Sequence, residues 1–502
     1  MPILGQLYRH SLALLTDLYE LTMAYGYWRS GTHTREAVFH HHFRKPPFGS
    51  GFTVACGLAQ AIEFIERLQF GDDDLGYLAG LQGNDGKPLF DGEFLDHLRG
   101  LRFACDVDAV PEGTVVFPHE PLIRVKGPIL QAQILETPLL NILNFQTLIA
   151  TKAARVCLAA QGDTVLEFGL RRAQGIDGGL SASRAAYAGG CHGTSNVLAG
   201  KLFGIPVGGT HAHSWVLSFD TELESFEAYA RAMPNNCVFL VDTYDTLEGV
   251  RHAIQVGRWL REQGREMVGI RLDSGDLAYL SREARKILDE AGFPEAQIFA
   301  SSELDEHLIE SLKLQGSKIA VWGVGTNLVT AKDDPALGGV YKLTAVRNAG
   351  DIDGPWKYKV KLSEQSVKIS TPGIQQVRRY SADGEFVADM IFDEELGAPA
   401  APTIVDPADL TRRKEIAAGT EHTDLLVPVF RKGERVYDPP PLKEVRERTL
   451  EQLRGFHGGI KRFANPHRYP AGLERGLFDL KTHLILQARG LEAPTETLEE
   501  IR

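Results

Sequence analysis

Residues 267–276 read MVGIRLDSGD, a short β-branched run that ends in charged residues, a serine and a glycine. The central part of the chain repeats this make-up in DTVLEFGL (163–170), IPVGGTHA (205–212), NCVFLVD (236–242), MVGIRLD (267–273), AQIFASS (296–302) and KIAVWGV (318–324). Between these runs lie stretches such as 246–264, where apolar residues recur with helical spacing. The alternation predicts βα units and a parallel sheet or barrel over roughly 145–345.

The composition is that of a globular protein with a sizeable core. The chain has 502 residues, of which 43% are hydrophobic and 24% charged. Its net charge of -12 argues against a nucleic-acid partner, although a local basic pocket remains compatible with it. Neither a long apolar run nor a secretory signal pattern is found, so we expect a cytoplasmic protein without a membrane partner. The five cysteines form no CxxC pair and are interpreted as buried thiols.

The two flanking regions, 1–140 and 346–502, are richer in short β-type runs, Pro and Gly. VPEGTVVFPHEPLIRVKGP (110–128) and YKVKLSEQSVKISTPGIQQVRRY (358–380) predict antiparallel strands packed beside the core at 141–345. The Ala and Pro content of 397–414 predicts a linker.

In βα barrels the chemistry lies at the carboxyl ends of the strands, and these ends are polar and glycine-rich here. They read FGLRRAQG, GGTHAHS, VDTYDT, RLDSGD, ASSELDE and WGVGTN. Asp, Ser and Thr at such positions can also do no more than cap the next helix, and Ser302 with Asp305 has the spacing of a capping box.

A metal-dependent barrel hydrolase is one interpretation of the pair His211 and His213, because imidazoles at a strand end can converge on a divalent ion. The later strand ends offer only carboxylates, namely Asp242, Asp273 and Asp276, which disfavours it. His213 could equally be a hydrogen-bonded core histidine. The run His40–His42 cannot serve one metal, because neighbouring strand residues point to opposite faces, and an exposed or edge strand is expected there.

A phosphate site is the stronger interpretation. The glycines of WGVGTN (322–327) let backbone N–H groups approach phosphate oxygens, and FGLRRAQG (168–175) adds two guanidinium groups. RLDSGD and VDTYD add further carboxylates. Together these segments predict a pocket for a sugar phosphate that carries Mg²⁺.

These motifs, together with LLTDLYELTMAYGYW (14–28), resemble nicotinate phosphoribosyltransferase in order and spacing over nearly the whole chain. The resemblance implies a type II phosphoribosyltransferase fold of class α/β. Its parts would be an irregular TIM-like α/β barrel and a second β-rich domain formed from the N- and C-terminal regions. It also implies a homodimer with shared active sites.

The activity that the resemblance implies is condensation of nicotinate with 5-phosphoribosyl 1-diphosphate, which gives nicotinate mononucleotide and diphosphate in NAD biosynthesis. The reaction would be coupled to ATP hydrolysis through a phosphohistidine, which is His213 here, with Mg²⁺ carried by the substrates rather than by protein ligands. A neutral imidazole can attack the γ-phosphorus of ATP.

The remaining roles are carried over by motif. Tyr19, from the second subunit, and Phe168 would sandwich the pyridine ring, while Thr210 and Arg271 would hold its carboxylate. The residues that would hold the phosphoribosyl and diphosphate groups are Arg171, Asp242, Asp273, Gly325 and Thr326. Plainer roles stay open: Phe168 as core filling, Asp242 as a helix cap and Asp17 as a fold contact.

One motif departs from the family pattern. After the PG pair of STPGIQQV (370–377) a basic residue is expected, and Ile374 and Gln375 stand there, which puts a phosphate contact from this loop in doubt. A nicotinamide-specific enzyme remains an alternative interpretation. An inactive barrel that serves as a binding module is disfavoured, because polar groups remain at every strand end.

Overall fold

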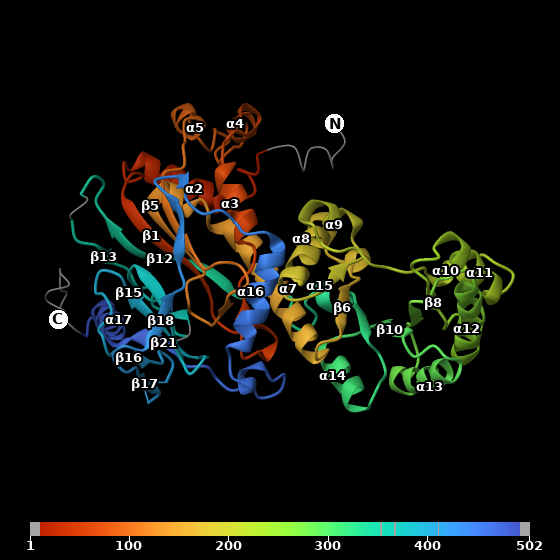
Figure 1. Cartoon of the computed structure of the whole chain (residues 1–502). Coiled ribbons are helices and arrows are strands. Elements are labelled where there is room, and N and C mark those ends of the chain that lie inside the picture. The colour runs from red at the N-terminus through yellow and green to blue at the C-terminus, as the bar shows by residue number, and fades with distance from the viewer. Residues whose placement is uncertain (1–10, 352–353, 366–367, 410, 492–502) are drawn as a thin grey trace.

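A computed structural model describes residues 11–351, 354–365, 368–409 and 411–491. Three larger sheets and a two-stranded one make up its β-structure. Helices α7 and α16 separate the parallel sheet from the two other large sheets (Figure 1). Among the described residues, no helix is long and apolar enough to cross a bilayer.

The central segment forms a six-stranded parallel sheet in the order β7-β6-β11-β10-β9-β8. Its strands are β6 (Thr164–Glu167), β7 (Gly193–Thr194), β8 (Val238–Leu240), β9 (Gly269–Leu272), β10 (Gln297–Ser302) and β11 (Val321–Val324). These strands confirm the parallel α/β core, but the described strands do not close into a barrel, since β7 and β8 remain the edges.

The run 205–212 does not form the predicted strand. Only Val207 makes a bridge, to Thr194 of β7. At the other end of the run, Nε2 of His211 accepts a hydrogen bond from the backbone N–H of Leu240 in β8 at 3.3 Å. A side chain therefore takes the place of a ladder hydrogen bond, in a segment where Pro206 and two glycines disfavour regular pairing.

Helices cover the parallel sheet and the N-terminal core. In the first half of the chain they are α2 (Leu18–Arg29), α3 (Leu58–Glu66), α4 (Asp72–Ala79), α5 (Gly92–Arg99), α6 (Ile129–Gln133), α7 (Glu136–Ala159), α8 (Gly175–Ala188), α9 (Val197–Phe203), α10 (His213–Val216) and α11 (Glu222–Ala232). Those that follow are α12 (Thr246–Glu262), α13 (Leu277–Glu290), α14 (Glu306–Leu314), α15 (Thr326–Val329), α16 (Leu442–Arg454) and α17 (Arg475–Ala488). Short 3₁₀ turns lie at η1 (Pro47–Gly49), η2 (Leu170–Arg172) and η4 (Gly458–Lys461).

The second, β-rich part draws strands from both ends of the chain, as predicted. Its seven-stranded sheet has the order β13-β12-β1-β5-β3-β19-β20. The strands are β1 (Glu36–Phe43), β3 (Asp106–Ala109), β5 (Ile123–Pro128), β12 (Gly339–Arg347), β13 (Lys357–Tyr358), β19 (Val427–Arg431) and β20 (Glu434–Arg435), and β2 (Thr53–Val54) pairs with β4 (Val115–Val116) beside them.

The prediction that 397–414 is a linker is wrong. Two strands of the third sheet begin within it, and that sheet has the order β17-β16-β21-β15-β14-β18. Its strands are β14 (Gln375–Ala382), β15 (Glu385–Asp393), β16 (Thr403–Val405), β17 (Arg413–Glu415), β18 (Glu421–Asp424) and β21 (Ala471–Glu474). The prolines are accommodated because β16 and β17 lie at one side of the sheet.

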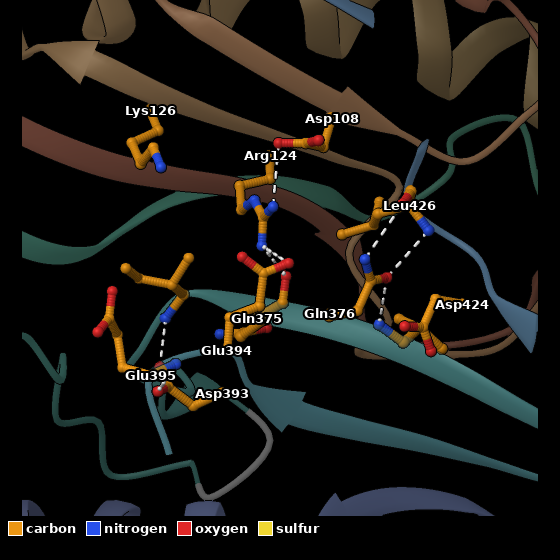
Figure 2. Close-up of polar contacts among 12 residues, drawn as sticks. Asp108, Arg124, Lys126, Gln375, Gln376, Asp393, Glu394, Glu395, Asp424 and Leu426 are labelled. Atoms are coloured by element: carbon orange, nitrogen blue, oxygen red, sulfur yellow. Dashed lines mark hydrogen bonds and ion pairs between the residues drawn. The ribbon is translucent and has the colours of Figure 1, made fainter. Parts of the chain in front are cut away.

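Polar side chains join the seven-stranded sheet to the third sheet (Figure 2). The buried guanidinium of Arg124 donates to Oδ2 of Asp108 and to the carbonyl oxygen of Gln375, each at 3.0 Å. The amide of Gln376 pairs with the backbone of Leu426 through two hydrogen bonds of 3.0 and 3.1 Å. The glutamines of the unusual STPGIQQV motif therefore hold the sheets together.

The prediction of an exposed or edge strand at His40–His42 is also wrong, because β1 lies inside its sheet and both of its faces are covered. On one face, Nε2 of His40 accepts from the backbone N–H of Gln375 at 3.1 Å. On the other, His41 hydrogen-bonds Asn144 of α7 at 2.9 Å. Both rings are fully buried, and burial lowers the pKa of His41 to about 4.

This burial predicts that the protein loses stability as the pH falls from about 6.5 toward 4. Within that window the unfolded chain binds protons that the folded rings cannot take up. Replacement of His41 by Gln should reduce the slope of unfolding free energy against pH by about 1.4 kcal/mol per unit. Denaturant titrations at several pH values measure this slope, with His422→Gln, at an exposed position, as the control. An unchanged slope in His41→Gln would contradict the assignment.

Candidate active site at the carboxyl ends of the parallel strands

A cavity of about 530 Å³ opens at the carboxyl ends of the parallel strands. Seven of the predicted site residues line it, namely Phe168, Arg171, Thr210, Arg271, Asp273, Gly325 and Thr326. The other lining residues are Arg172, Ser195, Gly209, His211, Ala212, Ser301, Ser302, Glu303 and Gly323. The structure thus gathers segments that are up to about 160 residues apart in sequence, as expected for the ends of parallel strands.

Arg271 is the most constrained cation of the cavity. Its Nη2 donates to the carbonyl oxygen of His211 at 2.6 Å and its Nη1 to Oγ of Ser301 at 3.1 Å. The side chain is 14% exposed, and burial lowers the pKa of its guanidinium. Its Nε is buried and has no hydrogen-bond partner within the described parts of the chain. A ligand that brings a carboxylate would satisfy it.

Phe168 stands at the wall of the cavity and is only partly buried, so it is more than core filling. A Cβ on Gly323 would lie 2.6 Å from the phenyl ring, so the ring position depends on glycine there. The turn below the ring is fixed by Glu167, which is fully buried. Its carboxylate accepts from the backbone N–H of Gly169, from Ser183 at 2.8 Å and from Thr194 at 2.5 Å.

His213 is the first residue of α10, and its side chain is 39% exposed. Its Nδ1 hydrogen-bonds Oγ1 of Thr243 at 3.0 Å. Its Nε2 lies 3.8 Å from Oδ2 of Asp273 and 3.9 Å from Oδ1 of Asp242. The ring is thus accessible and held at one nitrogen, which leaves the other nitrogen available.

Asp242 is no helix cap. The N-cap of α12 is Asp245, whose side chain accepts from the backbone N–H of Glu248. Instead, Oδ2 of Asp242 accepts from the backbone N–H of Asp273 at 2.8 Å and from Oγ of Ser274 at 2.7 Å. Its Oδ1 faces His213 and has no hydrogen-bond donor among the residues that the structure describes.

His211 and His213 lie in different environments, and His211 has a supporting role. The His211 ring is buried, and burial lowers its pKa to about 4. It supports the backbone of β8 and, through its carbonyl oxygen, Arg271. Within the described ranges, no cluster of three or more His, Cys, Asp or Glu side chains is placed to hold a metal ion.

Tyr19 does not line this cavity. It lies on α2, next to the seven-stranded sheet, with 46% of its surface exposed. Asp17 accepts a hydrogen bond from Oγ1 of Thr137 at 3.2 Å, a contact that supports the fold of this segment.

The sequence singled out neither Ser301 nor Thr243 as a site residue, although both stand in the quoted strand ends. The hydroxyl of Ser301 donates a hydrogen bond to Oδ1 of Asp273 and accepts one from Nη1 of Arg271. The capping box assigned to Ser302 and Asp305 is not formed, because Asp305 alone caps α14 by accepting from Leu308.

Fold and site therefore define an α/β protein with an arginine-lined cavity at the ends of parallel strands. Family models of nicotinate phosphoribosyltransferase match the chain as an N-terminal domain at 14–144, a family region at 164–377 and a C-terminal domain at 375–481. The chain is 42% identical to the nicotinate phosphoribosyltransferase of Bacillus subtilis, over 95% of this chain and 96% of that one. It is 45% identical to one of Mycobacterium tuberculosis, over 89% and 88% of the two chains.

The crystal structure of human nicotinic acid phosphoribosyltransferase superposes with a TM-score of 0.81 at 33% identity, and covers 93% of this chain and 99% of that chain. A nicotinate-nucleotide pyrophosphorylase from Pyrococcus furiosus shares the fold, with a TM-score of 0.64 at 21% identity. The chain belongs to the nicotinate phosphoribosyltransferase family.

The buried carboxylate of Glu167 generates a prediction about the turn that carries Phe168 and Arg171. In Glu167→Gln one acceptor oxygen is replaced by an amide NH₂ group, which cannot accept hydrogen bonds from the surrounding N–H and O–H donors. Each lost hydrogen bond to the charged group costs about 1.5–3 kcal/mol of stability. We expect trypsin to cleave native protein after Arg171 or Arg172 at least about tenfold faster. Mass spectrometry of timed digests measures this rate, with exposed Glu248→Gln as the control. Equal rates would show that Glu167 does not hold the turn.

Proposed function

We propose that the protein transfers the phosphoribosyl group of 5-phosphoribosyl 1-diphosphate to nicotinate. The products are nicotinate mononucleotide and diphosphate, in a step of NAD biosynthesis in the cytoplasm. The observation that carries this proposal is the buried guanidinium of Arg271, which keeps an unpaired N–H at a cavity walled by Phe168. A flat ring with a carboxylate matches this pair, because a carboxylate can accept hydrogen bonds from a guanidinium in a way that a neutral amide cannot match.

The ring of nicotinate would stack on Phe168, with its carboxylate between Arg271 and Thr210. Thr210 stands at the start of the THAH segment, next to the carbonyl oxygen that already fixes Arg271. The acceptors at His211 and Ser301 keep the guanidinium in place before nicotinate binds, so little ordering has to occur on binding.

The phosphoribosyl diphosphate would occupy the other half of the cavity. Arg171 supplies a cation, and Gly325 and Thr326 form the start of the short helix α15, where backbone N–H groups point outward. Asp242 and Asp273 lie on the side next to His213.

In the transfer step the pyridine nitrogen attacks the anomeric carbon, and the bond from that carbon to the diphosphate oxygen breaks. The electron pair leaves with diphosphate, so no protein nucleophile is required. The contribution of the chain is to align the ring with the anomeric carbon and to stabilise the departing charge through Arg171 and the α15 backbone.

His213 would couple the reaction to ATP. Its Nδ1 is engaged with Thr243, so Nε2 is the nitrogen that would attack the γ-phosphorus, with ADP as the leaving group. Hydrolysis of the N–P bond then releases phosphate and restores the imidazole. The exposure of the ring, at 39% of the side chain, allows a nucleotide to reach it.

The residues around Nε2 fit a nucleotide that carries Mg²⁺. The Oδ1 atom of Asp242 has no donor in the described parts of the chain, and Asp273 brings a second carboxylate to within 3.8 Å of the same imidazole. Two carboxylates would repel a bare phosphate, so a cation between them and the phosphate is required electrostatically. When bound, Mg²⁺ would supply that neutralisation and coordinate phosphate oxygens.

We further propose a homodimer in which Tyr19 reaches the cavity of the partner subunit. Around Tyr19, the apolar side chains Leu15, Leu18 and Met23 are 45%, 53% and 37% exposed. Next to the cavity, α8 and α9 expose a second apolar set, Ile176, Val197, Leu198 and Leu202. In a two-fold dimer, the surface around Tyr19 of each subunit would pack against α8 and α9 of the other. Both apolar surfaces would then be buried in each subunit, and Tyr19 would complete the site for the pyridine ring.

Two finer assignments of the fold also stay proposals. The first is that the segment 205–212 completes an irregular TIM-like barrel through contacts such as that of His211 with Leu240. The second is a division of the chain into 1–140, 141–345 and 346–502.

The test of function and mechanism uses the purified protein with nicotinate, 5-phosphoribosyl 1-diphosphate, Mg²⁺ and γ-labelled ATP. We expect nicotinate mononucleotide to form and an acid-labile, alkali-stable phosphate to appear on the peptide that contains His213. In His213→Ala the label should be absent while transfer continues without ATP coupling, at a reduced rate. His422→Ala, at an exposed position, is the matched control. Label on another peptide rejects the role of His213, and absence of the mononucleotide rejects the function.

A further inference from the structure

A second cavity, of about 450 Å³, lies between the N- and C-terminal regions, away from the parallel sheet. We call it the C-terminal cavity. It is formed where 44–53 and 116–119 of the N-terminal region meet 406–408 and 466–472 of the C-terminal region. None of its lining residues belongs to the cavity at the parallel strands. In Figure 1 its strands β15 and β21 lie on the other side of α16 from β6 and β10.

The wall of the C-terminal cavity is aromatic. Phe117 and Tyr469 stack on each other with their ring centroids 4.2 Å apart and their planes 19° apart, and Phe52 adds a third ring to the lining. The cavity volume falls within the range of about 300–1,000 Å³ that is usual for small-molecule sites. Phe52, Phe117 and Tyr469 are each 5% exposed or less, so they border the cavity with a small part of their surface.

The rim of the cavity is cationic, although the chain as a whole has a net charge of -12. Arg44 and Arg468 line it, and the single carboxylate of the lining, Asp406, is paired with Arg468 at 2.7 Å. Arg44 has no ion pair or hydrogen bond to another residue within the described ranges. One guanidinium at the cavity is thus left without a counter-charge.

His119 adds a hydrogen-bonding group at the same place. Its pKa is lowered to about 4 by burial and then by Lys481, Arg44 and Arg468, against the opposing effect of Asp406. The ring of His42 lies 6.0 Å away. Because the lowered pKa leaves this ring neutral near pH 7, its imidazole can donate a hydrogen bond to an anion that pairs with Arg44.

Two further observations indicate a built site rather than a packing gap. His119 has φ 71°, a left-handed conformation that is costly for a residue with a Cβ and that glycine would adopt more easily. Its backbone N–H is fixed to the carbonyl oxygen of Phe43 at 2.8 Å, which holds the ring at the cavity. Thr53, also in the lining, is fully buried, and its hydroxyl has no partner among the described residues.

We propose that the C-terminal cavity binds a small molecule in which an anionic group is attached to a flat aromatic ring, with a nucleoside monophosphate as its simplest form. The ring packs against the parts of Phe117 and Tyr469 that line the cavity, the anion lies between Arg44 and His119, and the hydroxyl of Thr53 takes part in a hydrogen bond to the ligand. The proposal does not rest on the proposed function, because it involves no residue of the other cavity.

The test is photolabelling of the full-length protein with 8-azidoadenosine monophosphate, followed by tryptic mapping. We expect label on peptides 103–124 and 469–475, which contain Phe117 and Tyr469. Excess adenosine monophosphate should remove it, whereas adenosine alone and inorganic phosphate should compete at least about tenfold more weakly, since each supplies only half of the contacts. Nicotinate, as a competitor, distinguishes a ring carboxylate from a phosphate as the anion.

The two variants are Arg44→Gln and His119→Gly. Glycine is chosen at position 119 because it adopts the left-handed backbone conformation without strain. Each should weaken binding about tenfold, the effect of one lost charge-assisted hydrogen bond. Asp383→Gly is the matched control, since Asp383 has φ 52° in an exposed turn away from the cavity. Arg271→Gln should leave this labelling intact, which separates the result from the proposed function. Label confined to peptides of the parallel sheet, or unchanged binding in both cavity variants, would overturn the proposal.

Discussion

The buried guanidinium of Arg271 is the constraint on which the candidate active site depends. A cation that is 14% exposed has to find acceptors, and it finds them in the carbonyl oxygen of His211 and the hydroxyl of Ser301. These contacts tie the irregular segment 205–212 to strands β9 and β10. They also place His213 at the start of α10, beyond the edge of the cavity. The Nε–H group of Arg271 stays unpaired among the described residues, and we propose that a ligand carboxylate binds at this guanidinium.

Buried polar groups hold each loop of the site in the same way. Glu167 fixes the turn that presents Phe168 and Arg171, Asp242 fixes the turn after β9, and His211 supports β8. Polar groups at this depth cost free energy unless they are paired, so each one specifies a single loop conformation. The side chain of His213, for which we propose the phosphoryl transfer, stays accessible. Rigid supports beneath exposed groups are what a reaction by alignment requires.

Much of this could be predicted from the sequence, because strand periodicity and polar strand ends are local signals. Five of the six predicted runs form strands of one parallel sheet, and their ends meet as expected. The parts that could not be predicted depend on contacts between distant segments. The residues His40–His42 look like an exposed edge only until a second sheet and α7 are known to cover both faces of β1. The strands of 397–414 form because β21, near the end of the chain, offers an edge to pair with.

The site shows the same limit. Asp245 rather than Asp242 caps α12. The residue types do not reveal which of the two aspartates stands at the start of the helix. The expected strand at 205–212 failed because a histidine side chain replaces backbone pairing there. Tyr19 lies outside the cavity of its own chain, and the role proposed for it requires a partner subunit.

The most direct test of the account compares kcat/KM for nicotinate and nicotinamide in the unaltered protein and in Arg271→Gln. We predict a strong preference for the acid in the unaltered protein. In the variant this preference should fall about 100-fold or more, through loss of nicotinate turnover alone. Arg172→Gln, at an exposed arginine of the same cavity, should keep the preference. An acid-to-amide ratio that is unchanged in Arg271→Gln would contradict the claim that this buried guanidinium selects the substrate.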